Sequence, residues 1–552
     1  MQVHLIQQSN SQNKKAPQFK GAGDAFLRYL ATNQAVGANA VDLGFMVIPR
    51  TATDLIGRGP AAGLETGRRE ASGTINHSLI GVYGGVAGAA IAGIGGINKK
   101  FKAQANTIMA AEETLNILAE KKATQIQTNK SQLDYITDVL KSIKAFNPSS
   151  NYADAEGFVN LSNENFKQQV DDIARILDDA ITDTNVSYKK WTKKGSANSF
   201  DAVFNKILEI TGAESKCVLE STDKKSLSNT NLKTLLEDIF KVSDAFNKTD
   251  VKNAFREQIE AGKKVTENKF IKALSKFNKN KSLAGFIIGS AVGMSIQPIN
   301  IYLTKKKTGS DGFVGVEGRE KDTSTKFKLM KGAAGAAFFG MVLATLKTGL
   351  KGFMDKMAFK GFWPTISQMK GIYGLTIVSR LLATRDQDEL REALTKDTLG
   401  FLSWLVLGDI VNKLTATALD DKNNTVLNST EKEAKGLWQN VKRAFKAQLK
   451  TRDEIVIESL AKNGISTTKT ENGKVVAKTF KEMLKDLDTL PENIKKITKK
   501  RLGTLNKAQL AGYAFSGLVL GLGIPNLNIY ITNKLDQKHK EKAAEKALLT
   551  QK

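Results

Sequence analysis

Residues 293–306 read GMSIQPINIYLTKK, and residues 521–534, GLGIPNLNIYITNK, nearly repeat them. Each copy closes a run without charged residues, which begins at Ser282 for the first and at Ala508 for the second. A helix needs about 20 mostly apolar residues to cross the hydrocarbon core of a bilayer. Both runs reach that length, so they predict membrane-spanning helices.

A weaker copy lies near the N-terminus. LGFMVIP (residues 43–49) has the same separation between Gly and Pro as the 293–306 copy. GLETGRRE (residues 63–70) follows it much as GVEGRE (residues 315–320) follows the later copy. This order predicts a degenerate repeat: a hydrophobic segment, a Pro, a short basic and Gly-rich loop, and a Gly/Ala-rich segment. The copy nearest the C-terminus ends after the first half.

The glycines of these runs recur at intervals of four residues, which places them on one helix face. In lipid, small residues let helices approach closely and gain packing contacts. In water each Gly would weaken a helix by roughly 1 kcal/mol relative to Ala. We therefore predict Gly-rich helix packing, which also offers a route to a homo-oligomer. The predicted packing positions are Gly81, Gly84, Gly85, Gly88, Gly285, Gly289 and Gly293.

The Pro, Asn and Tyr residues at the segment ends form a second set of candidates. Pro removes a helix donor and frees a carbonyl, a neighbouring Asn can satisfy such a group, and Tyr suits the headgroup level. The set marks either an exit from the apolar layer or a broken helix that lines a substrate or ion site. An exit is favoured, because the prolines lie near the segment ends. The residues are Pro49, Pro298, Asn300, Tyr302, Pro525, Asn528 and Tyr530.

Composition divides the chain into membrane and extramembrane segments, all expected to be α-helical. A small β-hairpin near 465–480 is the exception, because an Asn-Gly turn lies between β-prone flanks there. Residues 101–146 are expected to form a long helix or a short coiled-coil arm. The predicted order is a polar basic tail (1–26), the first repeat with two hydrophobic helices (27–99), a helical extramembrane domain (100–281), the second repeat with two hydrophobic helices (282–350), interfacial and short hydrophobic helices (351–419), a helical extramembrane region (420–507), the truncated third repeat (508–534) and a charged tail (535–552).

GLWQNVKRAFKAQLK (residues 436–450) predicts a basic amphipathic helix. Such a helix can lie on an anionic membrane. The alternative is a helix that packs on its own domain, which is the commoner case. The candidate membrane-surface residues are Trp438, Lys442, Arg443, Phe445 and Lys446.

Charge points to an anionic partner. Lys and Arg number 82 and Asp and Glu 56, a net charge of +26, which favours a bilayer with anionic lipids. Nucleic acid is disfavoured, because the lysines are spread along the chain and no binding module is recognisable. Asp42 and Arg380 lie within apolar segments, and each needs a partner or a wet face.

The sequence contains no recognisable catalytic or metal-binding motif. One cysteine and three separated histidines exclude a cysteine cluster and a paired-histidine zinc motif. Phosphate-binding and nucleophile-elbow motifs are missing. We therefore predict no catalytic residue, metal ligand, cofactor or enzyme activity. The polar N-terminus has no apolar core, so no cleavable signal peptide is expected.

These observations predict a non-enzymatic integral membrane protein, in a membrane that the sequence does not specify. Its role would be to organise the membrane or to form a small pore or transport path. One alternative is a soluble helical protein whose hydrophobic hairpins insert conditionally, as in pore-forming proteins. The other is a basic cytoplasmic scaffold that binds an acidic partner or nucleic acid.

Overall fold

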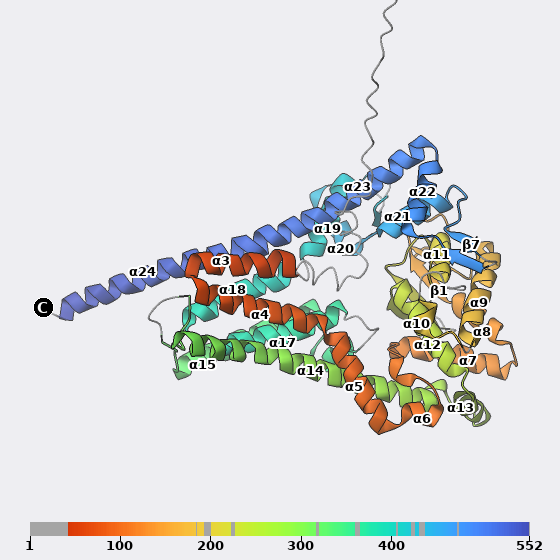
Figure 1. The fold of residues 1–552 in the computed structure, drawn as a ribbon, viewed down its shortest axis with the longest axis horizontal. Coiled ribbons are helices and arrows are strands. Elements are labelled where there is room, and N and C mark those ends of the chain that lie inside the picture. Colours follow the sequence, from red (N-terminus) through yellow and green to blue (C-terminus); the bar gives the residue numbers. More distant parts are fainter. Residues whose placement is uncertain are drawn as a thin grey trace, which may run out of the picture.

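The computed structural model describes residues 42–550 apart from residue 184 and the segments 193–199, 222–226, 316–319, 359–364, 404–406, 421–424, 430–435 and 472–473. The polar tail (1–26) and the start of the predicted first repeat lie outside these residues. The described chain forms two parts, here called the bundle and the head. Long helices lie side by side in the bundle, and shorter helices with small sheets form the head at the other end (Figure 1).

The bundle brings together segments from all three predicted copies of the repeat. α14 packs against α4, α5 and α17, while α15 packs on α17 and α18 on α24. Met46, Phe338, Phe401 and Leu520 belong to one buried hydrophobic cluster in its interior. The elements are η1 (Asp42–Val47), α3 (Ile48–Arg58), α4 (Pro60–Ser78), α5 (Ile80–Gly95), α14 (Lys269–Thr308), α15 (Thr325–Thr345), α16 (Leu350–Lys356), α17 (Ile366–Ala383), α18 (Gln387–Leu402), η6 (Ser516–Gly523) and α24 (Ile524–Thr550).

The π-helical segments η1 and η6 pack against each other inside the bundle. Each leads into an α-helix with a proline near its start, Pro49 in α3 and Pro525 in α24. The approach is close, because a Cβ atom on Gly521 would overlap the backbone of Phe45. π-Helical turns are rare and frequently lie at functional sites. The paired geometry is compatible with the predicted repeat, which stays a prediction.

The head combines the two chain regions that the sequence separates. Leu208, Phe246, Ile455 and Leu460 come from both regions and belong to one hydrophobic cluster. The elements of the head, of which α23 continues into the bundle, are α6 (Ile97–Phe101), η2 (Ala105–Thr107), α7 (Glu112–Gln127), α8 (Gln132–Leu140), β1 (Ile143–Phe146), β2 (Phe158–Asn160), η3 (Glu164–Phe166), α9 (Lys167–Thr182), α10 (Tyr188–Trp191), α11 (Phe200–Thr211), β3 (Cys217–Glu220), β4 (Leu227–Thr230), α12 (Leu232–Phe246), α13 (Thr249–Glu260), η4 (Val265–Glu267), α19 (Gly408–Leu419), β5 (Leu427–Asn428), α20 (Leu437–Lys446), β6 (Gln448–Leu449), α21 (Arg452–Ala461), β7 (Thr468–Glu471), β8 (Lys474–Ala477), α22 (Phe480–Thr489) and α23 (Glu492–Phe515).

The described chain is mostly helical, as predicted, but the head also contains a four-stranded antiparallel sheet in the order β2-β1-β3-β4. The prediction of a long helix or a short coiled-coil arm over residues 101–146 is wrong. Its helix is interrupted at Asn129, where φ is 50°, and a new helix starts at the Ser131 cap. Ile143 then pairs with Leu219 in the sheet. The residues that fit a heptad pattern instead form the buried apolar faces of separate short elements, α7, α8 and β1.

The predicted hairpin near 465–480 is confirmed, because β7 and β8 pair in antiparallel register from Thr468 with Ala477 to Glu471 with Lys474. The Asn-Gly turn that predicted it lies outside the described residues. The hairpin packs against α11. It therefore links the later chain region to the earlier one.

Three helices of the described chain are long and apolar enough to cross a membrane: α14, α15 and the continuous run Glu492–Glu541 through α23, η6 and α24. Ile287, Leu329 and Leu518 on these helices are 55%, 70% and 65% exposed. Among the described residues of 97–268, by contrast, Tyr152 is the one large hydrophobic side chain that is exposed. Exposed apolar side chains are therefore frequent on the bundle and scarce in this part of the head.

Candidate functional site

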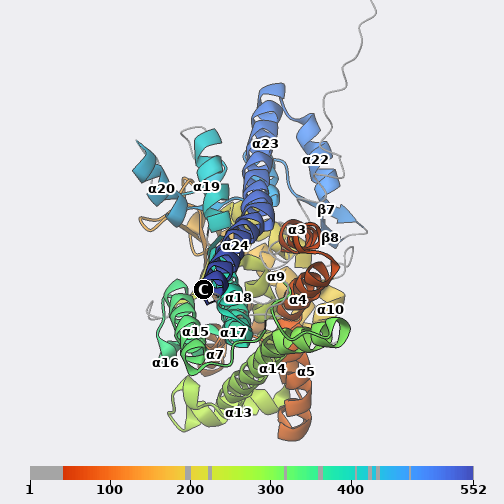
Figure 2. The same cartoon turned by 90° about the vertical axis from the view of Figure 1, so that its left-hand side faces the viewer.

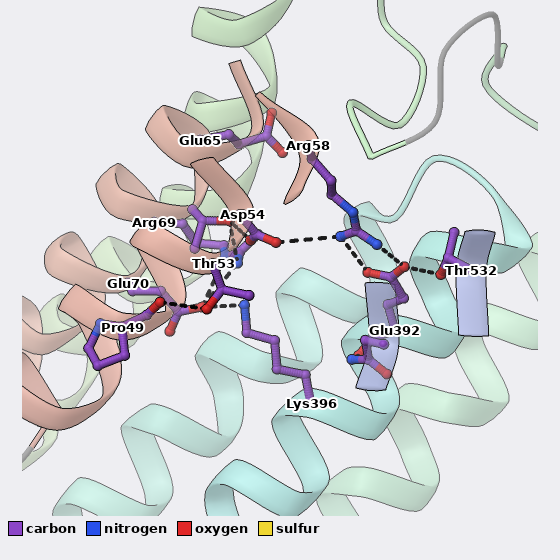
Figure 3. Close-up of polar contacts among 12 residues, drawn as sticks. Pro49, Thr53, Asp54, Arg58, Glu65, Arg69, Glu70, Glu392, Lys396 and Thr532 are labelled. Carbon is purple, nitrogen blue, oxygen red and sulfur yellow. Dashed lines mark hydrogen bonds and ion pairs between the residues drawn. The ribbon is translucent and has the colours of Figure 1, made fainter. Parts of the chain in front are cut away.

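A network of buried charges joins α3 and α4 to α17 and α18. Figure 3 shows the part that links α3 and α4 to α18. Its centre is the Glu70 carboxylate of α4. This carboxylate lies within ion-pair distance of four cations: Arg50 at 3.1 Å, Arg69 at 3.0 Å, Arg380 at 3.3 Å and Lys396 at 3.2 Å. Glu70 thus holds together side chains from four helices, which we call the Glu70 cluster.

Other acidic groups complete this centre. Asp397 of α18 has a fully buried side chain and lies 2.8 Å from Arg380. Asp42 of η1 accepts a hydrogen bond from the Thr74 hydroxyl of α4. The sequence indicated that Asp42 and Arg380 need partners. The structure provides partners for both from other helices.

The local sequence explains how α4 presents Glu70. Gly59, with φ of 88°, reverses the chain after α3, and Pro60 opens α4. Pro suits the first turn of a helix, and the Ala, Leu, Glu and Arg residues that follow favour helix. Residues 63–70 are therefore helical. Their prediction as a basic, Gly-rich loop is wrong.

Two further groups of ion pairs extend the network. Arg385 lies 2.8 Å from Glu65 and 2.9 Å from Glu389. Arg58 donates to Glu392 at 2.9 Å, and Glu392 also accepts a hydrogen bond from Thr532 of α24, as Figure 3 shows. The network thereby reaches the chain segment of the third predicted copy.

Small cavities lie beside this network. One of about 50 Å³ is lined by Arg58, Arg69, Lys396, Glu392 and Phe313 among others. A second of about 20 Å³ shares Arg69 with it. Spaces of this size hold a few water molecules. The charged interior can therefore be hydrated without opening a wide channel.

Proline-freed carbonyls are satisfied by side chains from other helices. Pro298 removes the α14 hydrogen bond to the Met294 carbonyl, and Ser379 of α17 donates to that oxygen at 2.7 Å. In the π-helical pattern of η6, the missing donor of Pro525 faces Leu520, whose carbonyl accepts from Arg50 Nε at 3.1 Å.

The neighbouring asparagines were expected to satisfy such carbonyls. Asn528 instead donates to the Glu392 carbonyl of α18 at 3.2 Å, and Asn300 is buried. Pro298 is exposed, whereas Pro525 is buried and Pro49 half-buried. Tyr302 and Tyr530 are 64% and 63% exposed on the outside of the bundle.

The predicted packing glycines differ in their surroundings. A Cβ atom on Gly289 would lie 2.9 Å from Ile372, and one on Gly88 would lie 2.6 Å from Lys281. Gly293 likewise leaves no room beside Thr376, whereas Gly85 has open space around it. Gly81, Gly84 and Gly285 are buried. Close approach between α14 and its neighbours thus depends on some of these glycines and not on others.

No protein family, characterised protein or solved structure matches this chain. Its function is therefore inferred from its own geometry.

The head contains another charged group. Glu458 lies 3.1 Å from Lys450, 2.8 Å from Lys462 and 2.5 Å from Arg501, beside a cavity of about 330 Å³. Burial alone would raise the pKa of the Glu458 carboxyl, but the three cations hold that pKa below its usual range. This group joins α21 to α23 and stabilises the head.

Only weak signals for the Glu70 cluster were present in the sequence. It marked Arg380 as a charge that needs a partner and singled out residues 63–70 as a repeated motif. It did not indicate that Arg58 would meet Glu392, 334 positions away. Pairing across such distances depends on the fold.

Proposed function

We propose that this chain is a non-enzymatic integral membrane protein whose bundle spans the bilayer. The observation that carries the proposal is the opposition of two surfaces in one bundle: apolar side chains outside and buried charges inside. On α14 alone, exposed large apolar residues recur from Leu283 to Leu303. These side chains are about half exposed, so covering each with lipid contributes about half of the roughly 1.5–3 kcal/mol that full burial gives.

The buried charges favour a small pore or transport role over a purely membrane-organising one. Ionisable residues inside membrane bundles usually face the interior, pair with one another and mark solute or proton pathways. The Glu70 cluster is likewise buried, its charges are paired, and small cavities lie beside it. A small ion or a proton is the class of solute that fits the cavity sizes.

Soluble alternatives explain the bundle surface less well. A cytoplasmic scaffold would leave in water the large apolar residues that recur along α14 from Leu283 to Leu303, and large contiguous apolar patches are rare on soluble monomers. A conditional inserter would need the bundle to rearrange before insertion. The buried ion pairs oppose such a rearrangement, because separating them in lipid leaves charges without partners.

The first experiment is extraction of the full chain from isolated membranes. Integral insertion predicts that the protein stays in the pellet after alkaline and high-salt washes and is released by detergent. Release by alkali or salt, or recovery as a soluble monomer without detergent, would contradict the proposal. Reconstitution into vesicles that contain a pH-sensitive dye then tests for ion or proton flux, with protein-free vesicles as the control.

A further inference from the structure

The prediction of Arg443 as a membrane-surface residue is wrong, because this side chain of α20 is buried. Arg443 and Ala444 are buried toward the protein, while Trp438 and Phe445 are 81% and 61% exposed. Seven residues make nearly two helical turns, so Trp438 and Phe445 lie on the same side of the helix. Lys442 lies between them and is also exposed. The outer face of α20 therefore combines two aromatic rings with a basic residue.

The end of α20 lies level with the start of a candidate membrane span. Ala447, directly after α20, is buried in a small cluster with Ala416 of α19 and Ala508 of α23. Ala508 is also the first residue of the uncharged run, which follows Lys507. In the membrane arrangement proposed above, this position is the boundary between lipid and water.

The views of the whole molecule agree with this position. Figure 1 shows α19 and α20 at the side of the head that faces the bundle. Figure 2, viewed along the bundle, shows α20 on the outer side of α19, away from α23. A helix placed there has the protein on one side and the region of the bilayer surface on the other.

We propose that α20 lies in the headgroup layer of an anionic leaflet, with Trp438 and Phe445 inserted and Lys442 at the phosphates. The inference rests on the proposed membrane function. Trp prefers the membrane interface, and basic helices with one aromatic face bind anionic lipid in the membrane plane. The contact fixes the depth of the bundle and orients the head toward the leaflet that carries anionic lipid.

Spin labels on the full chain test the proposal. Cys217→Ser provides a background without cysteine, into which Phe445→Cys is introduced while Trp438 is kept. Tyr152→Cys is the matched control for an exposed aromatic residue of the head, and Ile287→Cys reports on the bundle. The protein is reconstituted in phosphatidylcholine vesicles with or without phosphatidylglycerol, and accessibility to oxygen and to a water-soluble nickel complex is measured at each label.

The label at 445 is expected to show interfacial depth in phosphatidylglycerol vesicles, while the label at 152 stays aqueous. Lys442→Gln should lower the ratio of inserted to aqueous label at 445 by about fivefold, since a basic residue near an anionic surface contributes roughly 1 kcal/mol. An aqueous signal at 445 with a lipid signal at 287 would overturn the inference and keep the membrane function. An aqueous signal at 287 would overturn the membrane function itself. Spin–spin broadening at 445 would assign the face to a second copy of the chain and also overturn the inference.

Discussion

Glu70→Gln is the sharpest test of the charged interior. The substitution keeps the shape of the side chain and an acceptor oxygen but removes the negative charge that four cations share. Arg50 and Lys396 would still lie beside the side chain at position 70, but no carboxylate there would neutralise their charges. Glu70 is only 8% exposed and the cavity beside it is about 20 Å³, so water replaces little of the lost interaction.

Removing one partner of a buried ion pair typically costs about 3–5 kcal/mol, since the remaining charge stays buried. For a 552-residue chain that unfolds as one unit, this corresponds to a fall in melting temperature of about 3–4 °C. If uncompensated positive charge is the cause, Lys396→Met should restore part of the loss in the Glu70→Gln background while destabilising the wild type. Lys396→Met would thus raise stability in one background and lower it in the other. This reversal is expected only if Lys396 and Glu70 interact through their charges.

The assay is thermal unfolding of purified protein in detergent, followed by intrinsic fluorescence for all four variants of the cycle. Glu257→Gln is the matched control, because Glu257 pairs with Lys269 at 2.6 Å but both side chains are more than half exposed. Its melting temperature should stay at the wild-type value. The reasoning is refuted if Glu70→Gln melts within about 1 °C of wild type, or if Lys396→Met lowers stability equally in both backgrounds.

Three further predictions concern single sites. Ser379→Ala should destabilise the bundle by about 1–3 kcal/mol, because the Met294 carbonyl loses its donor; thermal unfolding measures this, and Ser379→Thr should retain most stability. Gly293→Ala should cost about 1–3 kcal/mol through overpacking, whereas Gly332→Ala, with open space around it, should be neutral or stabilising on the same assay. Burial raises the pKa of the Cys217 thiol, so iodoacetamide at pH 8 should label native protein far more slowly than urea-unfolded protein; equal rates would contradict this.

Hydrophobic spacing was sufficient to locate the long helices of the bundle. The uncharged runs beginning at Ser282 and Ala508 lie within two of the helices of spanning length. Period-four glycines also identified real points of close approach at Gly289 and Gly293. These features could be read from the sequence, because a span and its packing face are local patterns along one helix.

The charged network could not be read in the same way. Glu65 and Glu70 look like ordinary polar residues of a connecting loop until α4 forms and α17 and α18 pack beside it. The four-stranded sheet was missed for a related reason, since Ile143 fits a heptad and a buried strand equally well. In both cases the deciding partner lies far away in the chain.

Arg50 shows why the prolines and the charges belong to one structure. The π-helical turn before Pro525 leaves the Leu520 carbonyl without a backbone donor inside an apolar bundle, where an unsatisfied carbonyl is costly. Arg50 reaches that oxygen with Nε and Glu70 with another guanidinium nitrogen. Lysine has one donor centre at this distance, and an apolar residue has none. The carbonyl freed in the third copy is therefore satisfied by a cation whose own charge is neutralised from α4, so movement of η6 would disturb the Glu70 cluster directly.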